Sequence, residues 1–210
     1  MSVWAIVVAA GSGSRFGERK QYRALHGLRL LDWALRVPVD RCDGVVLVVP
    51  RDRAERSEPS VDAVVPGGST RSASVRSGLA AVPDDAEVIV VHDAARPVPV
   101  PEVWDRVIAA VVAGADAAIP VVPVSDTLWS TGDGSMAAGP VDRSGVVAVQ
   151  TPQAFRRGAL WAAHAGGGEA TDDASLVQAS GGRVVTVDGD PSNLKVTNPI
   201  DFAIAELLCR

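Results

Sequence analysis

The sequence predicts one α/β domain, spanning residues 1–210, in which a doubly wound, mostly parallel sheet carries a projecting β-hairpin arm. Short β-branched runs alternate with longer segments of helical periodicity, and this order implies right-handed crossovers between parallel strands. The first run, residues 3–9, is apolar throughout, as expected of a strand covered by helices on both faces. A length of 210 residues suits a single domain, and no internal repeat or linker interrupts it.

The expected elements follow one another in a regular order. Strands are predicted at residues 3–9, 44–49, 62–65, 87–91 and 117–122, and helices at residues 30–36, 69–81, 101–113 and 199–208. Pro101 and Glu102 open one helix, and Asn198 with Asp201 caps the last one. Because ligands of doubly wound sheets bind at the carboxyl ends of the strands, functional residues are expected directly after these strands.

Residues 126–150 break the alternation. They carry a turn signal at residues 132–134 (Gly-Asp-Gly) and end in the run 146–150, which together predict a projecting β-hairpin arm. An isolated two-stranded ribbon is only marginally stable in water, so the arm is expected to pack on a second copy of the chain. A floppy surface insertion is the alternative.

Composition excludes several classes of protein. Apolar residues make up 47% of the chain and charged residues 21%, which excludes a disordered protein. Twenty Lys and Arg residues oppose 25 Asp and Glu residues, a net charge of −5. Neither nucleic acid nor an anionic membrane surface is therefore an expected partner, and an anionic ligand requires a local cluster of cations.

The N-terminus and the cysteines bear on where the protein works. No basic residue precedes the apolar run 3–9, so a buried strand is expected rather than a secretory signal. Gly114 and two prolines interrupt the apolar stretch 107–124, which excludes a membrane span there. Cys42 and Cys209 are too few for a disulfide scaffold and match no metal-binding spacing, so a cytoplasmic protein with reduced thiols is expected.

A glycine-rich segment follows the first strand. Gly11, Gly13 and Gly17 allow a tight turn whose amide groups form an anion-binding nest, and Arg15 and Lys20 add two cations. A Walker loop is excluded because five residues separate the outer glycines and no lysine follows the second directly. In a dinucleotide-binding fingerprint the third glycine would come one residue earlier. The segment predicts a cradle for a triphosphate, with a plain strand–helix turn as the alternative.

The strand at residues 87–91 leads into the sequence HDAARP at residues 92–97. An aspartate at a strand's carboxyl end beside a phosphate loop is well placed for Mg²⁺, which takes one or two carboxylates and otherwise phosphate oxygens and water. A cap on the following turn is the alternative for Asp93. His92 is expected to be a packed side chain that orients the loop, with a catalytic role as the alternative.

Seven motifs occur in order along the whole chain. They are AAGSGSR…KQY at residues 9–22, GGxxRxxSV at 67–75, HDAARP at 92–97, VSDT at 124–127, VDR at 141–143, TPQ at 151–153 and NLKVT at 193–197. In this ordered set the chain resembles the 2-C-methyl-D-erythritol 4-phosphate cytidylyltransferase family of the non-mevalonate isoprenoid pathway. The resemblance implies a Rossmann-like nucleotidyltransferase fold.

The implied reaction joins methylerythritol phosphate to CTP, giving 4-diphosphocytidyl-2-C-methyl-D-erythritol and pyrophosphate. The acceptor is a phosphate monoester whose second pKa is about 6, so it is mostly dianionic at neutral pH. The reaction then requires neither a general base nor a covalent nucleophile, in agreement with the absence of any Ser-His-Asp or Cys-His pattern. Its difficulty is to bring two anions together, which preorganised cations can do.

The resemblance also implies roles for single residues. Arg15 and Lys20 would stabilise charge on the α-phosphate, and Asp93 would bind Mg²⁺. The implied CTP-binding residues are Ala9, Ala10, Gly11, Gly68, Ser74, Asp93 and Ala95. Lys195 and Arg96 would bind the acceptor phosphate, together with Thr127 and Arg143 from the arm of the other subunit in a homodimer. Arg143 and Lys195 would thereby join the catalytic set.

Two positions depart from the family pattern. Arg19 replaces the usual proline before Lys-Gln and would make the loop more mobile or add a third cation. Ser69 stands where many relatives carry an acidic residue, close to the expected base-reading contacts.

Three other functions compete with this interpretation. Ribitol 5-phosphate cytidylyltransferases resemble the chain too, but they tend to show AGG in the first loop and HDAVRP later. Ala10 and Ala95 therefore favour methylerythritol phosphate. A nicotinamide-dependent oxidoreductase is disfavoured by the misplaced third glycine and the cations of its loop. A non-catalytic binding paralogue is disfavoured by the intact set of charged residues.

Overall fold

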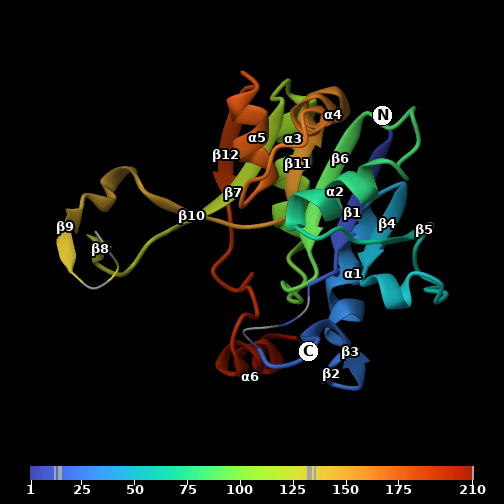
Figure 1. Cartoon of the computed structure of the whole chain (residues 1–210), viewed down its shortest axis with the longest axis horizontal. Coiled ribbons are helices and arrows are strands. Elements are labelled where there is room, and N and C mark those ends of the chain that lie inside the picture. The colour runs from blue at the N-terminus through green and yellow to red at the C-terminus, as the bar shows by residue number, and fades with distance from the viewer. Residues whose placement is uncertain (12, 14–15, 132–133, 135, 210) are drawn as a thin grey trace.

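An eight-stranded sheet organises the computed structural model, which describes residues 1–11, 13, 16–131, 134 and 136–209 (Figure 1). Its strands are β1 (Val3–Val8), β4 (Gly44–Val49), β5 (Ala63–Pro66), β6 (Val88–Asp93), β7 (Ala117–Pro123), β10 (Val147–Val149), β11 (Gln153–Arg156) and β12 (Val184–Asp188). The helices are α1 (Leu30–Arg41), α2 (Arg71–Leu79), α3 (Pro101–Val112), α4 (Arg157–Ala165), α5 (Asp173–Ala179) and α6 (Pro199–Leu208). Two small hairpins pair β2 (Ala24–Leu25) with β3 (Leu28–Arg29), and β8 (Leu128–Thr131) with β9 (Ala137–Val141).

The sheet has the order β10-β7-β11-β6-β1-β4-β5, and β12 also pairs with β7. Strands β6, β1, β4 and β5 run parallel, as do β7 and β12, whereas β11 is antiparallel to both of its neighbours. The doubly wound, mostly parallel sheet expected from the sequence is thus confirmed, with antiparallel additions on one side.

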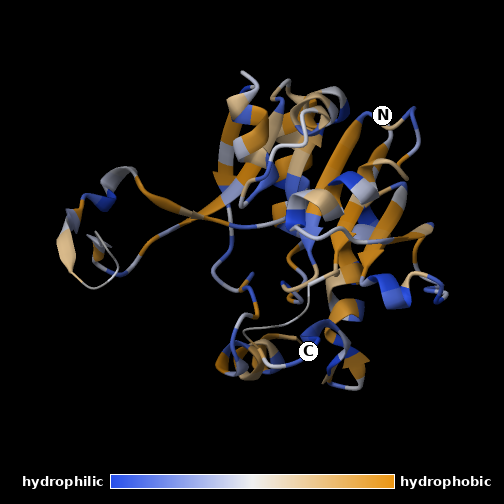
Figure 2. Cartoon of the chain, in the orientation of Figure 1, coloured by the Kyte–Doolittle hydropathy of each residue, from blue (hydrophilic) through white to orange (hydrophobic). Residues whose placement is uncertain are grey.

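Two apolar layers cover the faces of the sheet. Side chains of β1 alternate between them, so that Ala5 and Val7 belong to the core with α1 and α3, while Ile6 belongs to the core with α2, α4 and α5. All three are fully buried. Figure 2 shows hydrophobic colour along the central strands. Burial on both faces explains why these strands are unbroken apolar runs.

The carboxyl ends of three strands meet at one edge of the sheet. Val8 at the end of β1 pairs with Asp93 of β6 on one side and with Val48 of β4 on the other. The order in which strands are added reverses at β1: β4 and its parallel neighbour β5 lie on one side of it, and β6 lies on the other. The loops that follow β1, β5 and β6 therefore surround a single crevice, the usual ligand position in such sheets.

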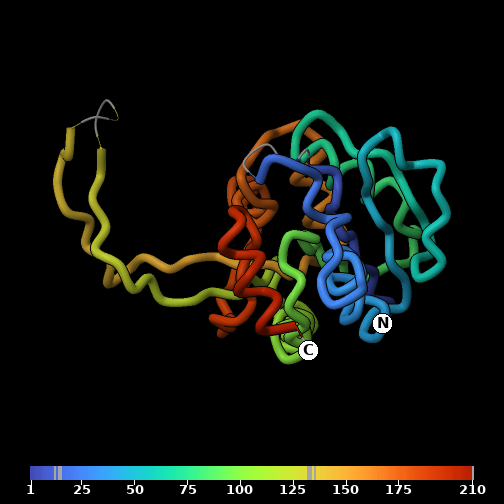
Figure 3. Tube along the Cα trace, turned by 90° about the horizontal axis from the view of Figure 1, so that it is seen from below, coloured from blue at the N-terminus to red at the C-terminus, as the bar shows by residue number. Residues whose placement is uncertain are grey.

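The arm differs in detail from the expected hairpin over residues 126–150. Its ribbon is β8 with β9, which projects from the body of the molecule (Figures 1 and 3). The run at residues 146–150 does not form the returning strand of the ribbon. Instead β10 pairs with residues 121–123 of β7, because an apolar β-branched segment extends the edge of the main sheet. Part of the expected turn, Gly132 and Asp133, lies outside the described residues.

Several elements were not predicted. These are the β2–β3 hairpin, β11, α4, α5 and β12. The predicted helix at residues 30–36 continues to Arg41, with Pro38 inside it. None of the described helices is both long enough and apolar enough to cross a membrane.

Candidate active site

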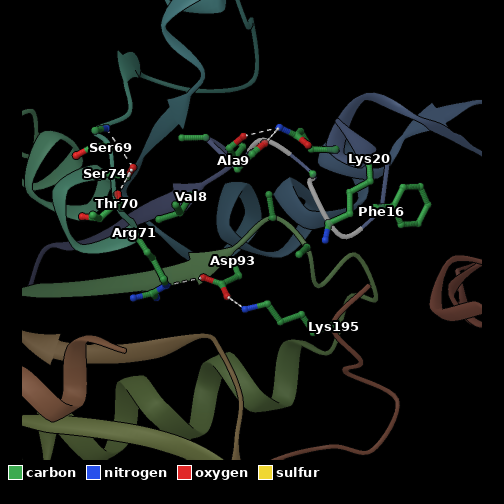
Figure 4. A pocket seen from close by; sticks show the side chains of 17 residues that line it. Val8, Ala9, Phe16, Lys20, Ser69, Thr70, Arg71, Ser74, Asp93 and Lys195 are labelled. Carbon is green, nitrogen blue, oxygen red and sulfur yellow. Dashed lines mark hydrogen bonds and ion pairs between the residues drawn. The ribbon is translucent and has the colours of Figure 1, made fainter. Parts of the chain in front are cut away.

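A cavity of about 540 Å³ lies at the carboxyl ends of β1, β5 and β6 (Figure 4). It is lined by Val8, Ala9, Ala10, Gly11, Gly13, Phe16, Lys20, Gln21, Gly68, Ser69, Thr70, Arg71, Ser74, Asp93, Ala94, Ala95 and Lys195. Most of the residues proposed from the sequence for nucleotide and phosphate binding are among them. In Figure 4 the loop with Phe16 and Lys20 and the turn with Ser69 and Thr70 lie on opposite sides of the cavity.

The loop after β1 is closed by local hydrogen bonds. Gln21 is buried, and its Nε2 donates to the carbonyl oxygens of Ala9 at 2.8 Å and Gly11 at 2.9 Å. Gly13 has φ +74°, and a Cβ there would lie 1.7 Å from the carbonyl oxygen of Glu18, so only glycine fits. Gln21 thus joins the two ends of the loop and fixes Lys20, its neighbour in the chain, at the cavity wall.

Both lysines of the chain belong to this cavity. The sequence contains only two lysines, Lys20 and Lys195, and its other strongly basic side chains are all arginines. The two line the same cavity, although they are 175 positions apart. A compact ammonium on a flexible stem is suited to contact phosphate oxygens that move during a reaction.

Asp93 is paired with two cations. One carboxylate oxygen accepts a hydrogen bond from Lys195 Nζ at 2.6 Å, and the other accepts one from Arg71 Nε at 3.1 Å (Figure 4). Burial by itself would raise the pKa of Asp93, but the charges of Arg71 and Lys195 outweigh it and hold that pKa well below its usual range. The carboxylate is therefore ionised at neutral pH and available as an oxygen ligand at the cavity wall.

Arg71 extends this pairing into the interior and is a site residue to which sequence reasoning gave no role. Its Nη1 donates to Asp173 at 2.7 Å, and Asp173 in turn accepts a hydrogen bond from His164 at 3.0 Å. Asp173 is fully buried at the start of α5. The motif GGxxRxxSV contains Arg71 and could have marked it as a site residue. Its partner Asp173 could not be found in this way, because it lies 102 positions away in the sequence.

A tight turn before α2 forms the opposite wall. Thr70 caps the helix by accepting from the amide of Ala73, and Ser74 Oγ donates to the carbonyl oxygen of Thr70 at 2.8 Å. The same hydroxyl accepts from the amide of Gly68 at 3.2 Å. A Cβ at Gly68 would lie 2.4 Å from Cβ of Ala73, so the turn requires glycine there. Ser74 thus shapes the wall that faces the loop after β1.

His92 is packed behind Asp93, as the sequence analysis expected. It is 3% exposed, and its Nε2 lies 3.1 Å from the carbonyl oxygen of Arg96, which makes Nε2 the donor. Nδ1 lies 3.3 Å from Thr151 Oγ1 and accepts from that hydroxyl, whose oxygen in turn accepts from the amide of Asp93 at 3.0 Å. The imidazole therefore orients the loop that carries Asp93.

Stability is expected to decrease as the pH falls from about 6.5 towards 4, because burial lowers the pKa of His92 to about 4 from an ordinary 6.5. In that interval the unfolded chain binds a proton that the folded chain excludes, so lowering the pH favours unfolding by up to about 3 kcal/mol. Urea unfolding at pH 7.0, 5.5 and 4.5 would measure this, with His92→Gln as the comparison. The same pH slope in both proteins would contradict the expectation.

Three of the predicted residues lie away from the cavity. Thr127 and Arg143 are exposed on the arm, where Arg143 Nη1 donates to the carbonyl oxygens of Val124 and Ser125, each at 2.6 Å. Arg96 is 8% exposed and directs its guanidinium at backbone carbonyls behind the cavity. Arg15 lies outside the described residues.

Arg19, which replaces the usual proline, pairs with Asp52 at 2.7 Å. It does not line the cavity, and it therefore braces the outside of the loop rather than adding a third cation inside it.

Possible metal ligands are few at this site. Within the described part of the chain, no group of three or more His, Cys, Asp or Glu side chains is arranged to hold a metal ion. Asp93 is the carboxylate among the residues that line the cavity. A metal bound here would need further oxygen ligands from a substrate and from water, which is the ordinary situation for Mg²⁺ on a phosphate.

Comparison with known proteins gives consistent matches. The family model for IspD, 2-C-methyl-D-erythritol 4-phosphate cytidylyltransferase, matches residues 3–210. A protein of that description from Saccharopolyspora erythraea is 43% identical over 98% of this chain and 98% of its own length. The crystal structure of the cytidylyltransferase from Thermus thermophilus superimposes with a TM-score of 0.85 at 35% identity, covering 99% of this chain and 98% of that one.

A longer relative also matches. The bifunctional enzyme IspD/IspF of Dinoroseobacter shibae is 42% identical over 100% of this chain, and the chain spans 54% of that relative's length.

Proposed function

This chain belongs to the 2-C-methyl-D-erythritol 4-phosphate cytidylyltransferase family, and from that premise we propose that it transfers the cytidylyl group of CTP to 2-C-methyl-D-erythritol 4-phosphate in isoprenoid precursor biosynthesis. The observation that carries the proposal is the cavity itself. It brings Lys20, Arg71 and Lys195 together around one carboxylate, Asp93, beside a glycine loop in a protein of net charge −5. That is the local cationic cluster that a triphosphate and a phosphate acceptor require.

The residues divide the chemical work. Ala9, Gly11 and the turn at residues 68–74 bind the nucleotide on the two walls of the cavity, and Lys20 faces the triphosphate. The acceptor phosphate attacks the α-phosphorus of CTP, a bond to the acceptor oxygen forms, and pyrophosphate leaves with the electron pair of the broken P–O bond. Since the acceptor is already a dianion, the side chains act by positioning and by charge rather than as a base.

Asp93 fits a magnesium site of the single-carboxylate kind. Each of its oxygens has one cationic donor and keeps a further lone pair, and the carboxylate is ionised at neutral pH. Mg²⁺ would neutralise charge on the triphosphate when it is bound. Lys195, which pairs with Asp93, is then the group that reaches the acceptor phosphate.

Homodimerisation through the arm is part of the proposal. The arm carries exposed Trp129, Met136 and Val141, and its ribbon belongs to a separate two-stranded sheet. Such a ribbon is marginal without a packing partner. Thr127 and Arg143 on the arm would then complete the acceptor site of the other subunit. The cytoplasmic location expected from the two cysteines stays a prediction.

An assay with purified protein tests the function. Pyrophosphate release is measured with CTP, Mg²⁺ and either methylerythritol 4-phosphate or ribitol 5-phosphate. Turnover with methylerythritol phosphate and little with ribitol phosphate is the expected result. The reverse preference would contradict the proposed acceptor, and no pyrophosphate release with either would contradict the transferase activity.

Asp93→Asn is expected to weaken magnesium-dependent CTP binding by at least about tenfold. Loss of a residue that only hydrogen-bonds a metal ligand already lowers metal affinity by about 10- to 100-fold, and loss of the ligand itself should cost no less. Calorimetric titration of CTP with Mg²⁺ or with chelator measures this without turnover. Asp84→Asn, an exposed carboxylate that neither lines the cavity nor contacts its loops, is the matched control. If the wild-type protein bound CTP equally well with Mg²⁺ and with chelator, the proposed magnesium site at Asp93 would be wrong.

A further inference from the structure

A buried polar cluster lies behind the cavity and joins three distant segments. Gln150 follows β10 at the base of the arm, Asn193 precedes Lys195 by two positions, and Arg96 belongs to the loop after β6. Their exposed fractions are 6%, 1% and 8%. Buried polar side chains are costly unless they are hydrogen-bonded, so their partners indicate what the cluster holds in place.

Gln150 holds the backbone of the segment before Lys195. Its Nε2 donates to the carbonyl oxygen of Asp190 at 2.8 Å, and its Oε1 accepts from the amide of Asp190 at 3.1 Å. The same Oε1 accepts from Asn193 Nδ2 at 3.2 Å. A Cβ at Gly189 would lie 2.7 Å from this oxygen, so the segment approaches Gln150 as closely as a glycine permits.

Arg96 holds the same segment from the other side. Its Nη1 donates to the carbonyl oxygen of Asn193 at 2.6 Å, and the amide of Val196 donates to the carbonyl oxygen of Ala95 at 2.8 Å. The backbone on either side of Lys195 is therefore held, at Asn193 before it and at Val196 after it. Its Nζ then lies 2.6 Å from Asp93. The guanidinium of Arg96 does not line the cavity.

We propose that Gln150 and Arg96 are positioning residues, which place Lys195 for the acceptor phosphate. Gln150 ties the segment 189–196 to the base of the arm, and Arg96 ties it to the loop after β6. This inference rests on the proposed function for the role of Lys195. It replaces the direct acceptor contact implied for Arg96 with an indirect one. Gln150 directly follows β10, so it ties the segment that carries Lys195 to the edge of the main sheet from which the arm projects.

Kinetics distinguish positioning from direct contact. Gln150→Met and Arg96→Met keep side-chain volume but remove the hydrogen bonds. Each is expected to raise KM for methylerythritol phosphate by about 10- to 100-fold, the scale of a misplacement near 1 Å, with KM for CTP within about twofold. In a Lys195→Ala background neither substitution should raise KM further, since residues that act through one group are not additive. A further increase in that background would show an independent contact and overturn the proposal.

Lost stability alone would give a different pattern. Trp33→Phe is the matched control, because it removes another buried hydrogen bond, from Trp33 Nε1 to the carbonyl oxygen of Leu25 at 2.8 Å. It should leave both KM values unchanged. If Trp33→Phe raised KM for the acceptor as Gln150→Met does, the effect would be general and the proposal would fail.

A measurement that needs no turnover completes the test. Because the chain has only two lysines, protein made with ¹³Cε-labelled lysine gives two side-chain NMR signals, which Lys20→Arg and Lys195→Arg assign. Gln150→Met should move the Lys195 signal toward that of free lysine and leave the Lys20 signal in place. An unmoved Lys195 signal overturns the positioning role. A wild-type protein without transferase activity would refute the proposed function, while this signal would still decide whether the cluster holds Lys195.

Discussion

Lys20→Ala is expected to lower kcat by about 10²–10³-fold while leaving the affinity for CTP nearly unchanged, the usual cost of removing a preorganised donor at a developing charge. Lys20 lines the cavity beside a loop that Gln21 holds closed, so its ammonium is in place before charge develops on the α-phosphate. Arg15→Ala is expected to behave in the same way. Steady-state kinetics together with CTP titration of the inactive variant separate kcat from binding.

Arg23→Ala is the matched control for this result. Arg23 is a cation three positions further along, but its guanidinium lies over the ring of Phe202, 4.4 Å from the ring centre. Its loss should leave kcat within about threefold, as for an ordinary surface substitution. If Lys20→Ala raised only KM for CTP and kept kcat, the lysine would bind ground state and transition state equally, contrary to the expectation.

Mixing two impaired variants, Lys20→Ala and Arg143→Ala, is expected to restore activity after subunit exchange, when the acceptor concentration is kept well below the raised KM of Arg143→Ala. If the arm of one subunit completes the other's acceptor site, a mixed dimer has one site with both lesions and one with neither. Random exchange would then return about a quarter of wild-type activity, since half of the dimers are mixed and each has one intact site. An arginine fork on the acceptor phosphate adds bidentate geometry to the point charge of Lys195.

Exchange itself must be observed independently, for example by native mass spectrometry of subunits of different mass. Proven exchange without recovered activity would contradict the shared site, and so would a fully active monomer. Arg143→Ala alone should raise KM for the acceptor and leave CTP binding intact, which checks that its lesion lies on the acceptor side.

The central strands could be predicted because burial on both faces makes each an unbroken apolar run. Residues 44–49 match β4 at both ends, and residues 117–122 match β7 to within one residue. The elements between residues 153 and 188 could not be predicted in this way. Strand β11 has four residues and is placed by partners on β6 and β7, and α5 has seven and is stabilised by burying Ala174 and Val177. Short elements depend on tertiary packing more than on local propensity.

The candidate site shows the same division. Asp93 could be assigned to the cavity because it lies at the end of a strand whose neighbours end at the same edge, whereas Ala9 and Gly68 were assigned through the family resemblance. The direction of a long side chain could not be assigned, since it depends on partners far along the chain. Arg96 turns from the cavity to the carbonyl oxygen of Asn193, which is 97 positions away.

The confinement of lysine to one cavity has a consequence for chemical modification. Acylating reagents and aldehydes react with primary amines, and in this chain those are the N-terminus, Lys20 and Lys195. Apart from a reaction at the N-terminus, every adduct is therefore formed on one of the two lysines that line the proposed catalytic cavity. Bound nucleotide would protect against labelling, and an aldehyde inhibitor could be directed to this cavity without competition from surface lysines.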